Sequence, residues 1–419
     1  MLQRLEETAE DTGGFRRGTQ RESKLGHYSI GWLNHSRKNV TVAISSRRPA
    51  TSFDFRKVSV VRASPDSQMF QTTVKRLAPT VFAVAIAAAI SSWCVAQTGQ
   101  NSVSPNQVRE IITQVKTATV SEDFLSQAAV VGGSLLREGR YPEAAELFSA
   151  LAVKRPNDVE IVYAQALAVF NGGRANEAEP IAQQAVTLAR LKMVGNPEAA
   201  PRAADTLVLL GIVLAVRAQD DQSLKALQEA ARIAPNHFDA QFALGRQLFG
   251  MGDDNGAAKA FRTAKSLQPA NAQVLFFLAT ALERSGEIQQ ALTAYRYLTS
   301  LRPEMSEGHL GLGALLLKRS AVDEAVRELE RALQINPDLY EAQVALGRAL
   351  VISGRPGDAV PHLQRAAELA PNNPEPHYQL SLAYRRLGRK QEAANEAETV
   401  KRIHESRRGT KGAAATRAS

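Results

Sequence analysis

A proline recurs at a fixed interval through the middle of the chain, and this spacing limits the folds that the sequence can adopt. Pro235, Pro269, Pro303, Pro337 and Pro371 are each 34 residues apart, and each follows an apolar stretch with helical spacing. Proline ends a helix because it lacks the N–H and its ring clashes with the preceding turn. A period of roughly 20 to 50 residues is typical of stacked repeats. The recurrence therefore predicts a repeat array.

Other residue types return in the same frame. If the proline is position 32, the units start at residues 125, 159, 204, 238, 272, 306, 340 and 374. Position 8 is small, position 20 is alanine or serine, and position 15 is glycine except at Ala218 and Ser320. Positions 4, 7, 8 and 11 share one helical face, and positions 20, 24 and 27 share another. Each unit is therefore predicted to be a helical hairpin, with position 8 facing position 20 and a left-handed cap at position 15.

This pattern resembles the tetratricopeptide repeat family, and the segment GRYPEAAELFSALAVKRP carries most of its signature. The resemblance covers residues 125–403 and implies an all-α fold: a right-handed superhelical solenoid of about eight antiparallel helix pairs. Two departures stand out. Position 4 lacks the aromatic residue that the family favours, and Arg190 replaces the expected proline of the second unit. We therefore expect that helix to run on, and a Gly/Pro/Ala-rich insertion near residues 190–203.

The segments that flank the array have their own patterns. Residues 97–124 are predicted to be a linker followed by a capping helix at 105–118, because Val108, Ile111, Ile112 and Val115 share one side. Residues 404–419 are basic and rich in alanine and glycine, which predicts a disordered tail.

The N-terminal hundred residues contain a segment with the layout of an export signal. Lys75 and Arg76 precede an uncharged stretch, 77–96, that ends in Cys94-Val95-Ala96. Charged start, short apolar core and small-residue end predict a signal peptide over 69–96, cleaved after Ala96. An uncleaved single-span anchor is the alternative, and either form places the array outside the cytoplasm. Residues 1–68 are interpreted as a disordered or non-native extension before a start at Met69, or as a cytoplasmic basic tail.

Charge and cysteine content exclude several classes of function. Residues 97–400 hold 31 Lys/Arg against 34 Asp/Glu, so the net charge of +9 comes from the two ends. We therefore expect no nucleic-acid partner, because phosphate binding needs basic residues on the folded surface. Cys94 is the one cysteine, and the histidines show no spacing typical of metal ligands. No phosphate-binding loop or nucleophile motif occurs. We expect no enzymatic activity, no cofactor and no metal.

The resemblance implies that first helices line a groove through positions 2, 5, 9, 12 and 13. These positions are rich in aromatic and charged residues, which suit a bound peptide or helix. The alternative is that the rings pack between units, as aromatic residues at helical spacing usually do. The candidate partner-binding residues are Tyr163, Phe170, Phe242, Arg246, Phe249, Phe276, Glu307, Arg348, Tyr378 and Arg385.

Two functions remain open on the sequence. The first is a non-enzymatic scaffold or adaptor in the cell envelope that binds a protein or peptide in the groove. The second is an accessory module that grips glycan or cell-wall material, with aromatic rings stacked on sugars. The family's carboxylate-binding residues at position 5 and its asparagines at position 6 are both absent.

Overall fold

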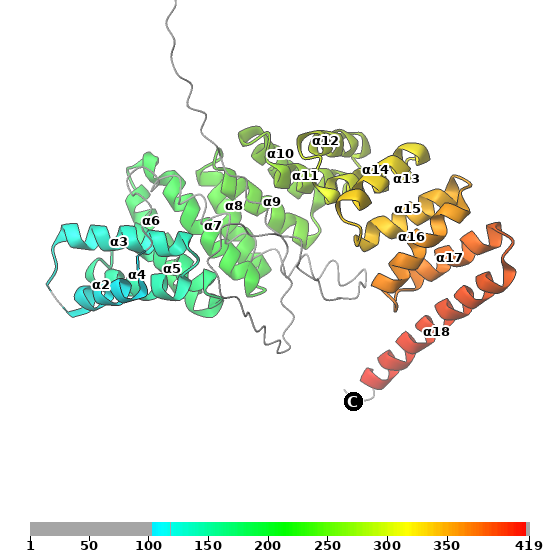
Figure 1. Cartoon of the computed structure of the whole chain (residues 1–419). Coiled ribbons are helices and arrows are strands. Elements are labelled where there is room, and N and C mark those ends of the chain that lie inside the picture. The colour runs from blue at the N-terminus through cyan, green and yellow to red at the C-terminus, as the bar shows by residue number, and fades with distance from the viewer. Residues whose placement is uncertain (1–102, 118, 416–419) are drawn as a thin grey trace, which may run out of the picture. The chain divides into compact units, whose positions relative to one another are not determined.

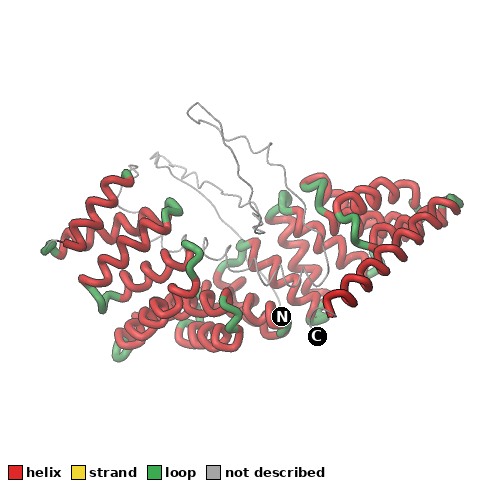
Figure 2. The backbone as a smooth tube through the Cα atoms, turned by 90° about the horizontal axis from the view of Figure 1, so that it is seen from below, coloured by secondary structure: helices red, strands yellow, loops and turns green. Residues whose placement is uncertain are grey.

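The computed structural model describes residues 103–117 and 119–415, and every regular element in this part is helical (Figures 1 and 2). The expectations for residues 1–68 and 69–96 lie outside the described residues. The helices are α2 (Pro105–Thr117), α3 (Glu122–Arg137), α4 (Tyr141–Lys154), α5 (Val159–Asn171), α6 (Ala175–Met193), the 3-10 helix η2 (Pro197–Ala199), α7 (Ala200–Val216), α8 (Asp220–Ile233), α9 (Phe238–Met251), α10 (Asp254–Leu267), α11 (Ala272–Arg284), α12 (Ile288–Leu301), α13 (Ser306–Lys318), α14 (Val322–Ile335), α15 (Tyr340–Ile352), α16 (Pro356–Leu369), α17 (Pro374–Arg386) and α18 (Lys390–Ala415).

The helices form eight consecutive hairpins, α3/α4 to α17/α18, here called units 1 to 8. Within each unit a short turn joins two helices that pack against each other, which makes them antiparallel. Each second helix also packs on the first helix of the next unit, and first helices of neighbouring units are in contact. The predicted all-α solenoid of helix pairs is confirmed.

The two helices of a unit approach closely where a glycine lies at position 8. A Cβ atom added to Gly245 would lie 2.6 Å from the Phe261 ring, and one added to Gly347 would lie 2.4 Å from Leu363. The glycine therefore faces the large side chain of position 24. Position 20 also lies close to position 8, as predicted: an added Cβ at Gly313 would lie 3.3 Å from the Ala325 carbonyl oxygen, and the Ser381 hydroxyl donates to the Ala393 carbonyl oxygen at 3.0 Å. Where position 8 carries a methyl group, as at Ala166 in unit 2, position 24 shrinks to Ala182.

In unit 5 the large side chain of position 24 packs against a glycine of the next unit. It has Ala279 at position 8 and Tyr295 at position 24. The Tyr295 ring lies against Gly311 of unit 6, where an added Cβ would be 2.4 Å from it. Its hydroxyl lies 3.1 Å from the Thr280 hydroxyl. A glycine on the next first helix thus provides the room that position 8 does not.

The turn inside each unit uses a left-handed residue at position 15. The six glycines there have positive φ, and the two exceptions adopt the same conformation, with φ of 58° at Ala218 and 60° at Ser320. Neighbouring contacts impose this backbone on alanine and serine, although it costs an L-residue about 1–2 kcal/mol.

Polar side chains at position 4 bind the carbonyl group of the proline that precedes them. Gln343 Nε2 donates to the Pro337 carbonyl oxygen at 2.8 Å, and Gln241 Nε2 donates to that of Pro235 at 3.0 Å. His309 Nε2 lies 3.2 Å from the Pro303 carbonyl oxygen. These bonds satisfy a carbonyl group that the ended helix leaves without an N–H partner, which explains why polar residues replace the family's aromatic residue here.

In the last three units, the side chain of position 23 bonds to the side chain of position 4. His309 Nδ1 lies 2.7 Å from a Glu328 carboxylate oxygen, and His377 Nδ1 lies 2.6 Å from one of Glu396. In unit 7 the roles are reversed, because His362 donates to Gln343 Oε1 at 2.8 Å. Burial lowers the pKa of His362, which favours the neutral ring that this bond uses. Histidines that looked unassigned in sequence therefore have structural partners.

The insertion after unit 2 differs from the predicted loop. Helix α6 runs on to Met193, as expected without a proline, but α7 begins at Ala200 instead of residue 204. Pro201 lies in the first turn of α7, where proline is tolerated because that N–H has no helical partner. Ala203 is buried, so packing extends the helix at its start.

The C-terminal end differs too. Residues 404–419 were predicted to be disordered, whereas α18 continues to Ala415. Unit 8 has Glu405 at position 32, so no proline ends its second helix. Ile403 is buried, and Arg407 Nη2 donates to the Asn372 carbonyl oxygen at 2.8 Å. These contacts extend the packed part of the helix beyond residue 403.

Helix α2 packs mainly against α4 and buries Val108, Ile112 and Val115, which is the arrangement expected of a capping helix. Among the described residues, one helical segment, Pro197–Val216, is long and apolar enough to span a membrane by composition. More than half of that segment is buried among the other helices, as in the core of a soluble protein.

The contact between positions 8 and 24 yields a test by compensation. Gly347→Ala should destabilise the array by about 1–3 kcal/mol, because the added methyl group overlaps Leu363. Leu363→Ala alone should cost about 2–5 kcal/mol through the cavity that it leaves. The double variant recreates the Ala166/Ala182 pair of unit 2, so urea unfolding should show a cost well below the sum. Additive costs would contradict this account of the close approach.

Candidate partner-binding surface

The structure buries most of the aromatic residues that the sequence assigned to a groove. The exposed fractions are 3% for Tyr163, 8% for Phe170, 4% for Phe242 and 8% for Phe249. Phe276 is partly buried and packs against the core. The assignment of Tyr163, Phe170, Phe242 and Phe249 to a binding surface is therefore corrected, because these rings are buried where first helices of neighbouring units are in contact. Phe276 keeps part of its ring in solvent.

A phenylalanine cluster occupies the joint of units 4 and 5. Its members are Phe238, Phe242, Phe249, Phe261, Phe276 and Phe277. Phe277 is central, because its ring centroid lies 5.7 Å from that of Phe261, 5.9 Å from Phe242 and 6.0 Å from Phe249. Offset and edge-on pairs at this spacing stabilise beyond the area that they bury. The cluster therefore joins the two units, with Phe242, Phe249 and Phe261 buried and the other three rings partly exposed.

Two arginines pack over this cluster. The Arg246 guanidinium lies 5.5 Å from the centre of the Phe277 ring, and that of Arg284 lies 4.4 Å from the centre of Phe249. Arg284 also pairs with Asp254 at 2.9 Å. Burial lowers the pKa of Arg246 to about 10, which still leaves it charged at neutral pH. Arg246 is thus partly buried and packs against the ring cluster.

Tyr163 belongs to a second group of side chains between units, which is polar and links units 2, 3 and 4. Arg202 lies 5.1 Å above the Tyr163 ring and pairs with Glu160 at 2.5 Å and with Asp205 at 3.0 Å. Asp205 in turn accepts from His237 Nε2 at 2.9 Å. Burial raises the pKa of the Tyr163 hydroxyl above its usual range. These side chains satisfy one another and hold three first helices together.

Glu307, at position 2 of unit 6, lies at the start of α13 and is partly buried. Its carboxylate accepts from the Ser306 hydroxyl at 3.2 Å. A carboxylate in the first turn of a helix also interacts favourably with the helix dipole, so its structural role is sufficient to explain it.

The remaining predicted residues lie on an exposed face of units 7 and 8. Arg348 and Arg385 are exposed, and Tyr378 keeps 52% of its surface in solvent. Ile352, which sequence reasoning missed, is 53% exposed one helical turn after Arg348 on α15. Tyr378 and Arg385 are seven residues apart on α17 and share one side of it, and α15 and α17 are in contact. We call these four residues the α15–α17 face.

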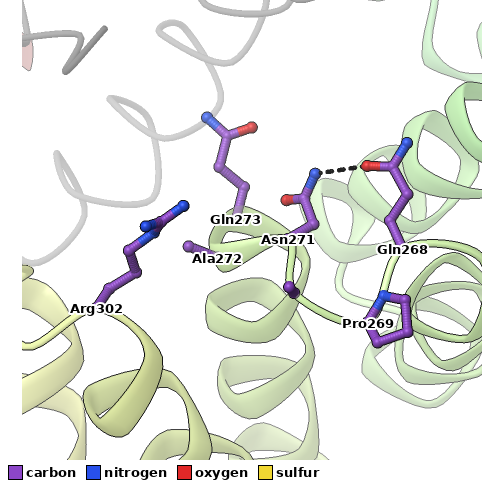
Figure 3. A pocket seen from close by; sticks show the side chains of 7 residues that line it. Gln268, Pro269, Asn271, Ala272, Gln273 and Arg302 are labelled. Atoms are coloured by element: carbon purple, nitrogen blue, oxygen red, sulfur yellow. Dashed lines mark hydrogen bonds between the residues drawn. The ribbon is translucent and has the colours of Figure 1, made fainter. Parts of the chain in front are cut away.

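An open notch of about 520 Å³ lies at the turn between α10 and α11 (Figure 3). Its lining consists of Gln268, Pro269, Ala270, Asn271, Ala272, Gln273 and Arg302. In Figure 3, Arg302 extends from the end of α12 toward Ala272, and Asn271 donates to Gln268 Oε1 at 3.0 Å. Sequence reasoning missed this notch, although arginine before the helix-ending proline was visible at Arg155-Pro156 and Arg302-Pro303.

Within the described residues, no three His, Cys, Asp or Glu side chains come together as a metal site would require. The strongest titratable cluster, around Asp205 and His237, is engaged in the joint between units.

The burial of the aromatic rings yields a test of their role. Phe242→Ala should lower stability by about 3–5 kcal/mol, because it removes a buried ring from the cluster. Tyr378→Ala should change stability by less than about 0.5 kcal/mol, since the ring is mostly in solvent. Urea unfolding of both variants checks this. Equal stability of the two would contradict the division into joint and surface.

Comparison with known proteins agrees with the helix pairs. A family model described as tetratricopeptide repeat matches residues 132–192, 276–340 and 344–402. The chain matches no curated protein. Among solved structures it is similar to a MamA protein, with 20% identity over 41% of this chain and 94% of that one at a TM-score of 0.38. It is also similar to a MamA fragment from Desulfovibrio magneticus RS-1, with 21% identity over 40% of this chain and 96% of that one at a TM-score of 0.39. A third similar structure is that of YrrB, described as a TPR protein with an unusual peptide-binding site. Its identity is 16% over 45% of this chain and 95% of that one, at a TM-score of 0.39.

The matched segments fall in units 1–2 and 5–8, and each unit of the described part is a hairpin packed on the next. The described array is built of tetratricopeptide repeats.

Proposed function

We propose that the chain is a non-enzymatic scaffold that binds a partner polypeptide on the α15–α17 face. Tetratricopeptide repeat proteins are generally non-catalytic interaction scaffolds, and the match to that family model supports this part of the proposal. The finer part, a peptide or protein bound at Arg348, Ile352, Tyr378 and Arg385, rests on this structure.

The single observation that carries the proposal is the exposure of Ile352 and Tyr378 on adjacent first helices. Removing apolar surface from water is favourable, and both side chains keep about half of their surface in water. Arg348 and Arg385 flank them, and tyrosine and arginine are enriched among residues that dominate binding energy. The pattern fits a partner segment with an apolar anchor and nearby carboxylates.

The glycan-binding alternative has less support. Stacking on sugar rings needs accessible aromatic faces, and Tyr163, Phe170, Phe242 and Phe249 are buried. Tyr378 alone of the predicted aromatic residues is mostly exposed. A row of stacking rings along the first helices is therefore missing from the described part.

A pair of surface substitutions tests the scaffold. Partners are first captured by cross-linking in the native cell and affinity purification of the full chain. Ile352→Ser with Tyr378→Ser should weaken binding of a purified partner at least about tenfold, which corresponds to about 1.4 kcal/mol. The thermal midpoint should not change.

The matched control is Tyr297→Ser, which removes a ring that is 40% exposed on the second helix α12. It should leave the affinity unchanged. Equal affinity of the double variant would exclude the α15–α17 face. Recovery of wall fragments without any polypeptide would exclude the scaffold itself.

The cell envelope is the proposed location of the array. The support is the sequence of residues 69–96, with Lys75 and Arg76 ahead of an uncharged stretch. Mass spectrometry of the native protein should find a mature N-terminus at Gln97, or an intact 77–96 segment in the membrane fraction. An array recovered only from the cytoplasm would contradict export. Peptides from residues 1–68 in the mature protein would contradict a start at Met69.

A further inference from the structure

Arginine occupies position 31 of two units, directly before the helix-ending proline. Arg155 of unit 1 has φ −129° and ψ 68°, and Arg302 of unit 5 has φ −134° and ψ 72°. Both backbone N–H groups bond to the carbonyl four residues earlier, at Leu151 and Leu298. The two side chains therefore leave the same kind of helix end in the same local geometry.

Unit 1 shows what an arginine in this place binds. Arg155 Nη2 donates to the Glu122 carbonyl oxygen at 2.8 Å and to the Ser126 hydroxyl at 3.2 Å. It also forms an ion pair with the Glu122 carboxylate. Glu122 and Ser126 belong to the first turns of α3, and Ser126 is position 2 of the unit. A glutamate and its own main chain thus occupy the site.

Unit 5 lacks these partners. The residue that corresponds to Glu122 is Pro269, and position 2 is the uncharged Gln273. Within residues 103–117 and 119–415, Arg302 forms no side-chain hydrogen bond or ion pair. Acidic residues hold position 2 in all the other units after the first: Glu160, Asp205, Asp239, Glu307, Glu341 and Glu375.

The space that the missing partners would fill is the notch of about 520 Å³ in Figure 3. Arg302 borders it on the side of α12, and Gln273 lies at the start of α11. Asn271 is engaged with Gln268 Oε1 and with the Val274 N–H. The guanidinium of Arg302 and the amides of Gln273 and Gln268 Nε2 remain as side-chain donors for a ligand. An uncompensated arginine with an amide beside it matches a carboxylate next to a peptide carbonyl.

We infer that this notch binds an Asp or Glu side chain of the partner polypeptide, paired with Arg302 as Glu122 is paired with Arg155. The amide of Gln273 donates to a main-chain carbonyl of the same segment. The inference rests on the proposed scaffold function and adds a second contact, on units 4 and 5, to the α15–α17 face. It specifies the partner's chemistry: an acidic side chain next to an accessible main-chain carbonyl group.

A displayed library of random peptides, selected on the full chain, tests this. Selected sequences should be enriched in Asp or Glu, and a selected acidic peptide should bind Arg302→Gln about five- to tenfold more weakly. Gln273→Glu should weaken it equally, because that carboxylate pairs with Arg302 from within. Arg155→Gln is the matched control and should leave the affinity unchanged, since that arginine is already occupied.

Replacing the acidic residue of the peptide by its amide should have no further effect on Arg302→Gln if the two groups interact. Selected peptides without acidic residues, or unchanged binding by Arg302→Gln and Gln273→Glu, would overturn the notch and leave the scaffold intact. Failure to select any peptide would count against both.

Discussion

The fold depends on the close approach of two helices around a residue of minimal size. At Gly132, Gly211, Gly245, Gly313 and Gly347 the side chain of position 24 lies where a Cβ atom would stand. That contact sets the separation of the helices in a unit. The units in turn expose a regular surface to their neighbours, so stacking can repeat without a separate solution for each joint.

Polar contacts complement this packing at the turns. The proline that ends a second helix leaves its carbonyl group at the joint, and Gln241, His309 and Gln343 reach back six residues to satisfy it. Each bond ties the start of a first helix to the end of the helix before it. The same side chains occupy the place of the family's usual aromatic residue, so polar bonding here replaces apolar packing.

Periodicity predicted the hairpins because the residues that begin and end each helix act through local chemistry. Proline at position 32, the left-handed residue at position 15 and the apolar face all act within one unit, and even Ala218 and Ser320 follow the frame. The groove assignment failed because burial of positions 5 and 12 depends on the neighbouring unit. Phe277 stands at position 6, where other units carry mostly small residues, and it closes the joint over Phe242 and Phe249. The notch at Arg302 was invisible for a related reason: it depends on a partner that the local sequence lacks.

Tyr295 links two units that the sequence frame separates. Its ring belongs to unit 5 but occupies the space beside Gly311 of unit 6, and its hydroxyl returns to Thr280 in its own unit. In a linear stack of repeats, unfolding from either end can stop at a boundary where neighbouring units make few contacts. Here neither unit can detach without exposing the ring or leaving a void beside the glycine. We therefore expect units 5 and 6 to unfold together as one cooperative block.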